Sequence, residues 1–132
     1  MAERLTPEER LALLPPLGEA GWGAEPETDS LRKVWRFRSF SEAWGFMARV
    51  ALLAEKADHH PDWTNRFNIV DLRLTTHAAG GLTRLDTELA VRIDRVAGAA
   101  DVVRDLSAPV LCLCKEKGWG PAADSLGGKE EA

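Results

Sequence analysis

Two adjacent histidines, His59 and His60, lie in the segment "EKADHHPDW", residues 55–63. The chain has only three histidines, and histidine is the side chain whose charge changes near neutral pH. A pair of them between acidic residues indicates a site that transfers protons. The alternative is that both are ordinary surface residues at the end of a helix.

The residues around this pair predict how it is presented. If the preceding helix reaches His59, Glu55 and His59 lie at positions i and i+4 on one face, where the carboxylate can orient the imidazole or hold its proton. Pro61 restricts the residue before it to extended conformations, so the helix is expected to break at the pair. Such a break allows both rings to face one cleft.

The third histidine, His77, follows a strand predicted over residues 69–76, where apolar and polar residues alternate. His77 shares a face with the polar ones, so we expect it outside the core. These histidines favour acid-base chemistry on a bound small molecule, and Trp63 and Phe67 are available to stack on a flat ring.

Two other chemistries are less favoured. Adjacent histidines do not form the i, i+4 ligand pair that a helix offers to zinc, and no serine or cysteine lies in a recognisable nucleophile elbow. Cys112 and Cys114 are separated by one residue in an apolar segment. We interpret them as small buried hydrophobes, with a redox or metal pair as the alternative.

Three capping patterns, at Thr6, Ser39 and Thr83, each precede apolar residues at helical spacing. They predict helices that run from 7 to about 15, from 40 to about 57, and from 84 to about 97. Asp86 completes the third pattern.

Alternating residues predict strands over 31–37 and 69–76, with a short strand near Trp22 and a connection at 62–68. Lys33 and Val34 interrupt the first alternation. The order of elements favours an α+β fold with antiparallel strands and helices on one face, because not every strand pair has a helical crossover. After residue 98 we expect a short helix, a brief apolar strand and a disordered tail.

The composition gives no indication of a nucleic-acid or membrane partner. The chain has 132 residues, a net charge of -4 and a pI near 5.4, which fits one mildly acidic domain. It has no apolar run of 18 residues, and its charged start differs from a signal peptide. We therefore expect a cytoplasmic protein.

The motifs "AEKADHHPDW" and "TTHAAGGLTRLD" together resemble the pterin-4a-carbinolamine dehydratases. Their signature is a Glu-Lys-x-x-His-His-Pro segment with a third histidine at the end of the next strand. The resemblance covers roughly residues 5–97, which indicates a dehydratase-like domain at 1–98 and a C-terminal extension at 99–132, partly disordered at its end. Leu85 departs from the family pattern, in which this position is commonly charged.

The resemblance implies a four-stranded antiparallel sheet with three helices packed on one face, in a homodimer or homotetramer. It implies dehydration of 4a-hydroxytetrahydropterin to quinonoid dihydropterin, which recycles the cofactor of aromatic amino acid hydroxylases. A hydroxylase would thus be a pathway partner. No metal or redox cofactor is implied, because the pterin is the substrate.

By similarity to the family, His59 and His77 form the acid-base pair and His60 chiefly holds the pterin. The remaining substrate-binding candidates are Glu55, Asp58, Pro61, Trp63 and Asp86. Glu55 and Asp58 would orient the imidazoles, or are surface charges at the helix end. Asp86 would act in the site, or as a helix cap.

Two other functions stay open. Relatives of this fold serve as dimerisation partners of transcription factors, so the domain could be a protein-binding module. Retention of all three histidines argues against a pure scaffold. An enzyme for another pterin, such as one in molybdenum-cofactor metabolism, would use the same pocket.

Overall fold

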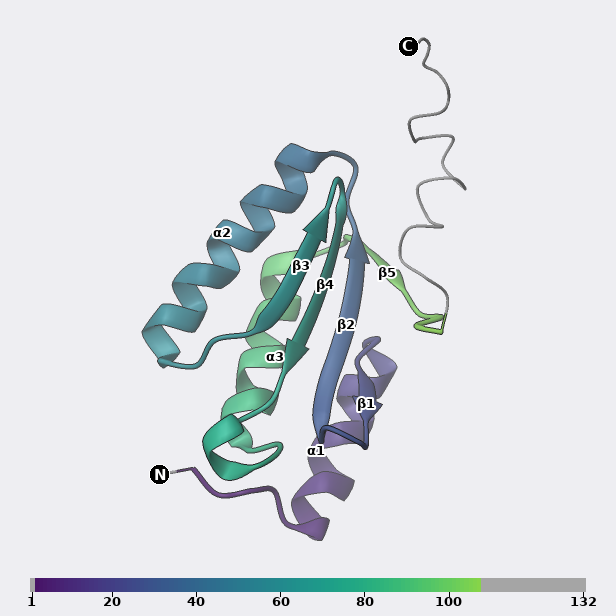
Figure 1. Ribbon diagram of the computed structural model, residues 1–132. Coiled ribbons are helices and arrows are strands. Elements are labelled where there is room, and N and C mark those ends of the chain that lie inside the picture. The colour runs from purple at the N-terminus through teal and green to yellow at the C-terminus, as the bar shows by residue number, and fades with distance from the viewer. Residues whose placement is uncertain (1, 108–132) are drawn as a thin grey trace, which may run out of the picture.

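The computed structural model describes residues 2–107 and shows three helices packed against one antiparallel sheet (Figure 1). In chain order its elements are α1 (Pro7–Glu19), β1 (Gly23–Glu25), β2 (Ser30–Arg36), α2 (Phe40–Ala57), β3 (Asp62–Arg66), β4 (Ile69–Leu74), a 3-10 turn (His77–Ala79), α3 (Arg84–Ala97) and β5 (Asp101–Val103). The two cysteines and the predicted disordered tail lie outside the described residues.

The sheet has five strands, and all its pairings are antiparallel. Its order is β1-β2-β4-β3, and β5 also pairs with β2. Since β4 occupies one side of β2, the two short strands share the other side: β1 lies opposite residues 30–32 and β5 opposite 34–36. The predicted α+β class is confirmed, and the predicted count of four strands is corrected to five.

One hydrophobic core joins the three helices to one face of the sheet. Trp35 of β2 contacts Phe46 of α2, with ring centroids 4.9 Å apart. The same buried cluster includes Leu17, Leu31, Val50, Val70, Leu72, Leu74, Leu89 and Ile93. This packing brings the end of α2, the end of β4 and the start of α3 to the same end of the domain (Figure 1).

Lys33, which interrupts the alternation of β2, is a buried cation with a partner. Its side chain is only 4% exposed, and its Nζ lies 2.7 Å from Asp94 Oδ1. The ammonium group also lies 5.8 Å from the ring centroid of Trp22 and 5.2 Å from that of Trp35. The ion pair and the aromatic faces compensate for the loss of water around the charge.

Val34, the second irregular position, faces the opposite side of the sheet. It forms a small separate core with Ile69, and Val103 and Leu106 pack against both. Val34 is therefore covered by the segment after α3, which contains β5 and Leu106.

Three element predictions were wrong. α1 continues through Pro15 to Glu19, which buries Leu17 in the core. Residues 62–66 form the edge strand β3 instead of a connection; an edge strand can be mostly polar because one of its faces meets solvent. Residues 101–103 form a strand instead of a helix, since β1 leaves that part of β2 unpaired.

Candidate active site

The three histidines come from two segments at one end of the domain. His59 and His60 follow α2, and His77 begins the 3-10 turn after β4. The helix covers the sheet that carries β4, so the fold brings these two segments together (Figure 1).

A left-handed residue at the end of α2 separates the orientations of His59 and His60. α2 ends at Ala57 as predicted, and Asp58 then adopts φ 51° and ψ 43°. This conformation is uncommon outside glycine but is tolerated by aspartate and asparagine. The reversal leaves His59 buried, with 8% of its surface exposed, whereas the His60 side chain is 58% exposed.

His59 forms a buried pair with Asp86. His59 Nε2 lies 2.6 Å from Asp86 Oδ1, and Asp86 has no exposed surface. The other carboxylate oxygen accepts hydrogen bonds from the Thr76 hydroxyl at 2.7 Å and from the Thr83 backbone N–H at 2.9 Å. An ionised carboxylate is only an acceptor, so we infer that His59 Nε2 carries a proton and that Nδ1 remains for a ligand.

Asp86 is both a helix cap and the partner of a histidine. It completes the capping box that Thr83 opens at the start of α3, as the sequence predicted. The Thr83 hydroxyl also lies 2.8 Å from that of Thr76 and accepts from the Leu85 N–H. The capping pattern could identify Thr83, but no sequence signal distinguished Thr76 from the other strand residues.

The other two histidines form exposed pairs. His60 Nε2 lies 3.1 Å from Glu55 Oε1, and His77 Nε2 lies 3.3 Å from Asp62 Oδ2. The expected contact between Glu55 and the first histidine of the pair is absent, because α2 ends before the i+4 position is reached. Glu55 therefore orients His60, and Asp62 was missed as a partner of His77.

The remaining predicted residues differ in how close they come to the histidines. The Asp58 side chain forms no hydrogen bond with another described residue, so its contribution is the backbone reversal. Pro61, which lies between His60 and Asp62 in the chain, is half-buried, and Trp63 packs against the core. Phe67 follows β3 at its other end, about 17 Å of extended strand away, so it cannot wall this site.

Asp29 fixes the loop that follows His77. Its carboxylate accepts two hydrogen bonds from Arg10, each 2.8 Å, and one from the Leu82 N–H at 3.0 Å. The Arg10 guanidinium chiefly lowers the pKa of Asp29 to about 2. Gly81 approaches the same carboxylate so closely that a Cβ would clash with it. The loop between His77 and α3 is thus fixed to α1.

Within residues 2–107, no three histidine, cysteine or acidic side chains are grouped as a metal site. Each histidine instead pairs with one carboxylate. In the same part of the chain, no helix is long and apolar enough to cross a membrane.

The comparisons with known proteins agree with this arrangement. A family model described as "Pterin 4 alpha carbinolamine dehydratase" matches residues 3–96. The chain belongs to this family. The resemblance seen in the two histidine motifs is therefore confirmed, and the match runs from before α1 to the last turn of α3.

Two bacterial relatives are each named "Putative pterin-4-alpha-carbinolamine dehydratase". The protein of Rhodopseudomonas palustris (strain HaA2) is 49% identical over 98 residues, which cover 74% of this chain and 95% of the relative. That of Bradyrhizobium sp. (strain BTAi1 / ATCC BAA-1182) is 48% identical over 99 residues, which cover 75% and 98%.

Two solved structures share the fold. A transcriptional coactivator/pterin dehydratase from Brucella melitensis superposes with a TM-score of 0.68 at 42% identity, covering 73% of this chain and all of that one. A pterin dehydratase-like protein described as a RuBisCO assembly factor of the alpha-carboxysome gives a TM-score of 0.53 at 24% identity, covering 59% and 90%. The second likeness concerns the fold alone.

Proposed function

We propose that this protein dehydrates 4a-hydroxytetrahydropterin to quinonoid dihydropterin by histidine acid-base catalysis. The observation that carries the proposal is the buried pair of His59 and Asp86, with a 2.6 Å contact. A fully buried carboxylate beside an imidazole is an arrangement that orients a proton-transferring histidine. Membership of the pterin dehydratase family supports the choice of substrate.

The reaction needs two proton transfers. One proton is delivered to the hydroxyl that leaves C4a as water, and one is removed from a ring nitrogen as the double bond forms. His59 and His77 carry these steps. Asp86 holds His59 through Nε2, so that Nδ1 exchanges the proton with the substrate, and the carboxylate complements the charge of the imidazolium. His77 acts from the exposed side, beside Asp62.

The other candidate residues bind the substrate and shape the site. His60 holds the pterin and is oriented by Glu55. Asp58 acts through its backbone reversal, and Pro61 and Trp63 form the wall beside the histidines.

The proposal places the enzyme in the cytoplasm as a homodimer or homotetramer that recycles the pterin of an aromatic amino acid hydroxylase. Exposed apolar side chains on α2 support self-association: Phe40, Trp44 and Leu52 are 50–73% exposed. The same surface also favours the second candidate function, a protein-binding module. The Brucella melitensis protein, which is described as a transcriptional coactivator as well as a pterin dehydratase, points the same way.

Stopped-flow absorbance of freshly generated 4a-hydroxytetrahydropterin tests the proposal. Wild-type protein should accelerate dehydration strongly over the buffer rate, and His59→Ala and His77→Ala should each remove most of the acceleration. A folded, pterin-free wild type that gives no acceleration would exclude this substrate. The protein-binding module, or an enzyme for another pterin, would then be the better reading.

A further inference from the structure

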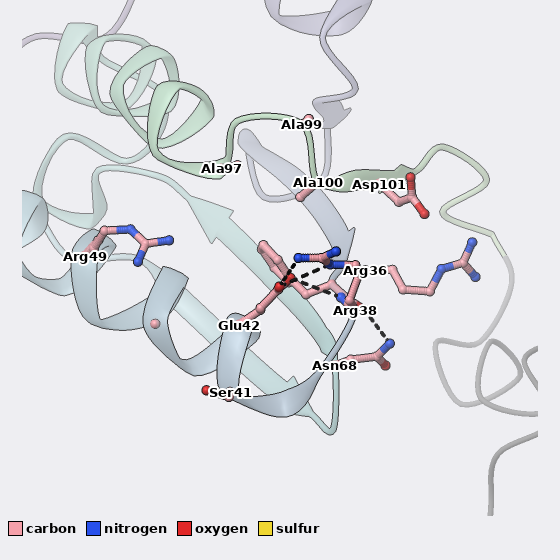
Figure 2. A pocket seen from close by; sticks show the side chains of 12 residues that line it. Arg36, Arg38, Ser41, Glu42, Arg49, Asn68, Ala97, Ala99, Ala100 and Asp101 are labelled. Atoms are coloured by element: carbon pink, nitrogen blue, oxygen red, sulfur yellow. Dashed lines mark hydrogen bonds and ion pairs between the residues drawn. The ribbon is translucent and has the colours of Figure 1, made fainter.

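A cleft of about 910 Å³ lies at the opposite end of α2 from the histidines (Figure 2). It is bounded by the end of β2, the first turns of α2, the β3–β4 hairpin and residues 97–101, which run from the end of α3 to the start of β5. The 18 residues of α2 span about 27 Å, so the cleft is a separate feature from the candidate active site.

The cleft has an excess of positive charge. Three arginines line it, together with two acidic residues, Glu42 and Asp101. Arg38 and Glu42 neutralise each other through a 2.8 Å ion pair, and this hydrogen bonding lowers the pKa of Glu42. Arg36 and Arg49 form no ion pair with any residue between 2 and 107, so at least one positive charge is left without compensation.

The two unpaired arginines lie at different ends of the cleft. Arg49 extends from α2 on one side of the Arg38–Glu42 pair, and Arg36 extends on the other side, where Asp101 also lies (Figure 2). Along α2, the rise from Phe40, its first residue, to Arg49 is about 14 Å, the length of about four residues of extended chain. A single small anion would therefore not pair with both Arg36 and Arg49.

Gly45 lets Arg49 adopt its position. Glycine is disfavoured in a helix interior, yet it occupies the middle of the α2 face that borders the cleft. A Cβ at this position would come within 3.3 Å of Arg49 Nη1. The missing side chain leaves room for the guanidinium to lie back along the helix.

The wall of the cleft also contains a donor and an acceptor without partners. Arg36 Nε and Asn68 Oδ1 are both buried and form no hydrogen bond within the described chain. Asn68 is 1% exposed, and its Nδ2 already donates to the Phe37 carbonyl at 2.7 Å, so Oδ1 is the free atom. Unsatisfied buried polar atoms are costly, and this combination fits a ligand that supplies both a C=O and an N–H.

We propose that this cleft binds an extended acidic peptide segment of a partner protein. Acidic side chains at least about four residues apart would meet Arg36 and Arg49, and a peptide group between them would pair with Arg36 Nε and Asn68 Oδ1. A nucleic-acid backbone offers the negative charge but no N–H or O–H donor in its phosphodiester linkages, so the peptide is favoured.

Fluorescence anisotropy on the full chain tests the proposal. The probe is a fluorescein-labelled heptapeptide with two glutamates at each end and glycine and alanine between them. Replacing the glutamates by glutamines should weaken binding at least tenfold. Methylating the three central amide nitrogens should weaken it several-fold, because Asn68 Oδ1 then has no donor.

Paired variants locate the binding. The double variant Arg36→Gln with Arg49→Gln should bind the glutamate peptide at least tenfold more weakly than wild type. Arg92→Gln with Arg95→Gln, which removes the same charge from the exposed surface of α3, should change binding less than twofold. Far-UV circular dichroism verifies folding, and Arg49→Gln alone, at an exposed position, should still weaken binding measurably.

Three outcomes would overturn the proposal: no binding of the glutamate peptide up to about millimolar protein, equal binding of the glutamine peptide, or equal losses in the two double variants. Tighter binding of a single-stranded oligonucleotide than of the peptide would assign the cleft to nucleic acid instead. None of these outcomes bears on pterin dehydration.

Discussion

The three histidines of this protein each have a carboxylate partner, yet only one of the pairs belongs to the interior. His59 and Asp86 are buried and 2.6 Å apart, whereas His60 and His77 contact carboxylates at 3.1 and 3.3 Å on the surface. A buried pair is held in one geometry and is costly to break, while an exposed pair contributes little to stability. The same side-chain chemistry therefore gives one fixed and two adaptable imidazoles.

The largest expected difference is between His59→Ala and His77→Ala. Removal of His59 leaves a fully buried carboxylate without its partner and should lower the free energy of unfolding by about 3 kcal/mol. Removal of the 79% exposed His77 side chain should change it by less than about 0.5 kcal/mol. Urea unfolding measures both values. Equal losses in the two variants would contradict the distinction between a fixed and an adaptable pair.

Asp86→Asn should separate the orienting role of Asp86 from its structural role. The asparagine oxygen can still accept from Thr76 and Thr83, but its amide would donate to His59 and shift the imidazole proton to Nδ1. We expect dehydration to fall about a hundredfold or more while the fold is kept. Imidazole ¹⁵N chemical shifts should report the exchanged tautomer; an unchanged tautomer with a full loss of activity would point to another role.

Asp29→Asn provides a carboxylate comparison without a histidine. The pKa of Asp29 is lowered to about 2, so its ion pair stabilises the fold above the ordinary pKa of 3.8, and this contribution is lost as the pH falls from 3.8 towards 2. The variant should be less stable than wild type by about 2 kcal/mol at pH 7. The difference should shrink below pH 4, and a difference that stays constant down to pH 2 would refute the assignment.

The smallest effects are expected for the exposed carboxylates. Glu55→Gln and Asp62→Asn should each change the free energy of unfolding by less than about 0.5 kcal/mol, because their pairs are solvated. Their effect should appear instead in the KM for the pterin and in its dependence on salt. A loss of 2 kcal/mol or more in either variant would show that these pairs are structural.

The sequence was sufficient for the features that depend on local patterns. Capping patterns in the sequence located the starts of all three helices, and the adjacent histidines with Pro61 located the end of α2. The capping pattern predicted the cap role of Asp86, whereas its place in the site was proposed from the family resemblance; in the structure the same residue contacts both the cap and His59.

Features that depend on contacts far apart in the chain could not be predicted. The contact between Thr76 and Asp86 arises only when β4 and α3 are packed together. The predicted partner of Glu55, His59, was wrong because one left-handed residue, Asp58, changes the direction of every side chain that follows it. The strand β5 has no pattern of its own and is defined by the free edge of β2.

Because β1 and β5 share one edge of β2, they join the sheet at different times as the chain is synthesised. The ribosome delivers α1 to α3 first, and these elements can pack while residues 101–106 are still in the exit tunnel. During that interval Val34 and Ile69 have no cover on the outer face of the sheet. β5 is therefore the last strand to join the sheet, and we expect its amide protons to exchange with solvent sooner than those of β2 and β4.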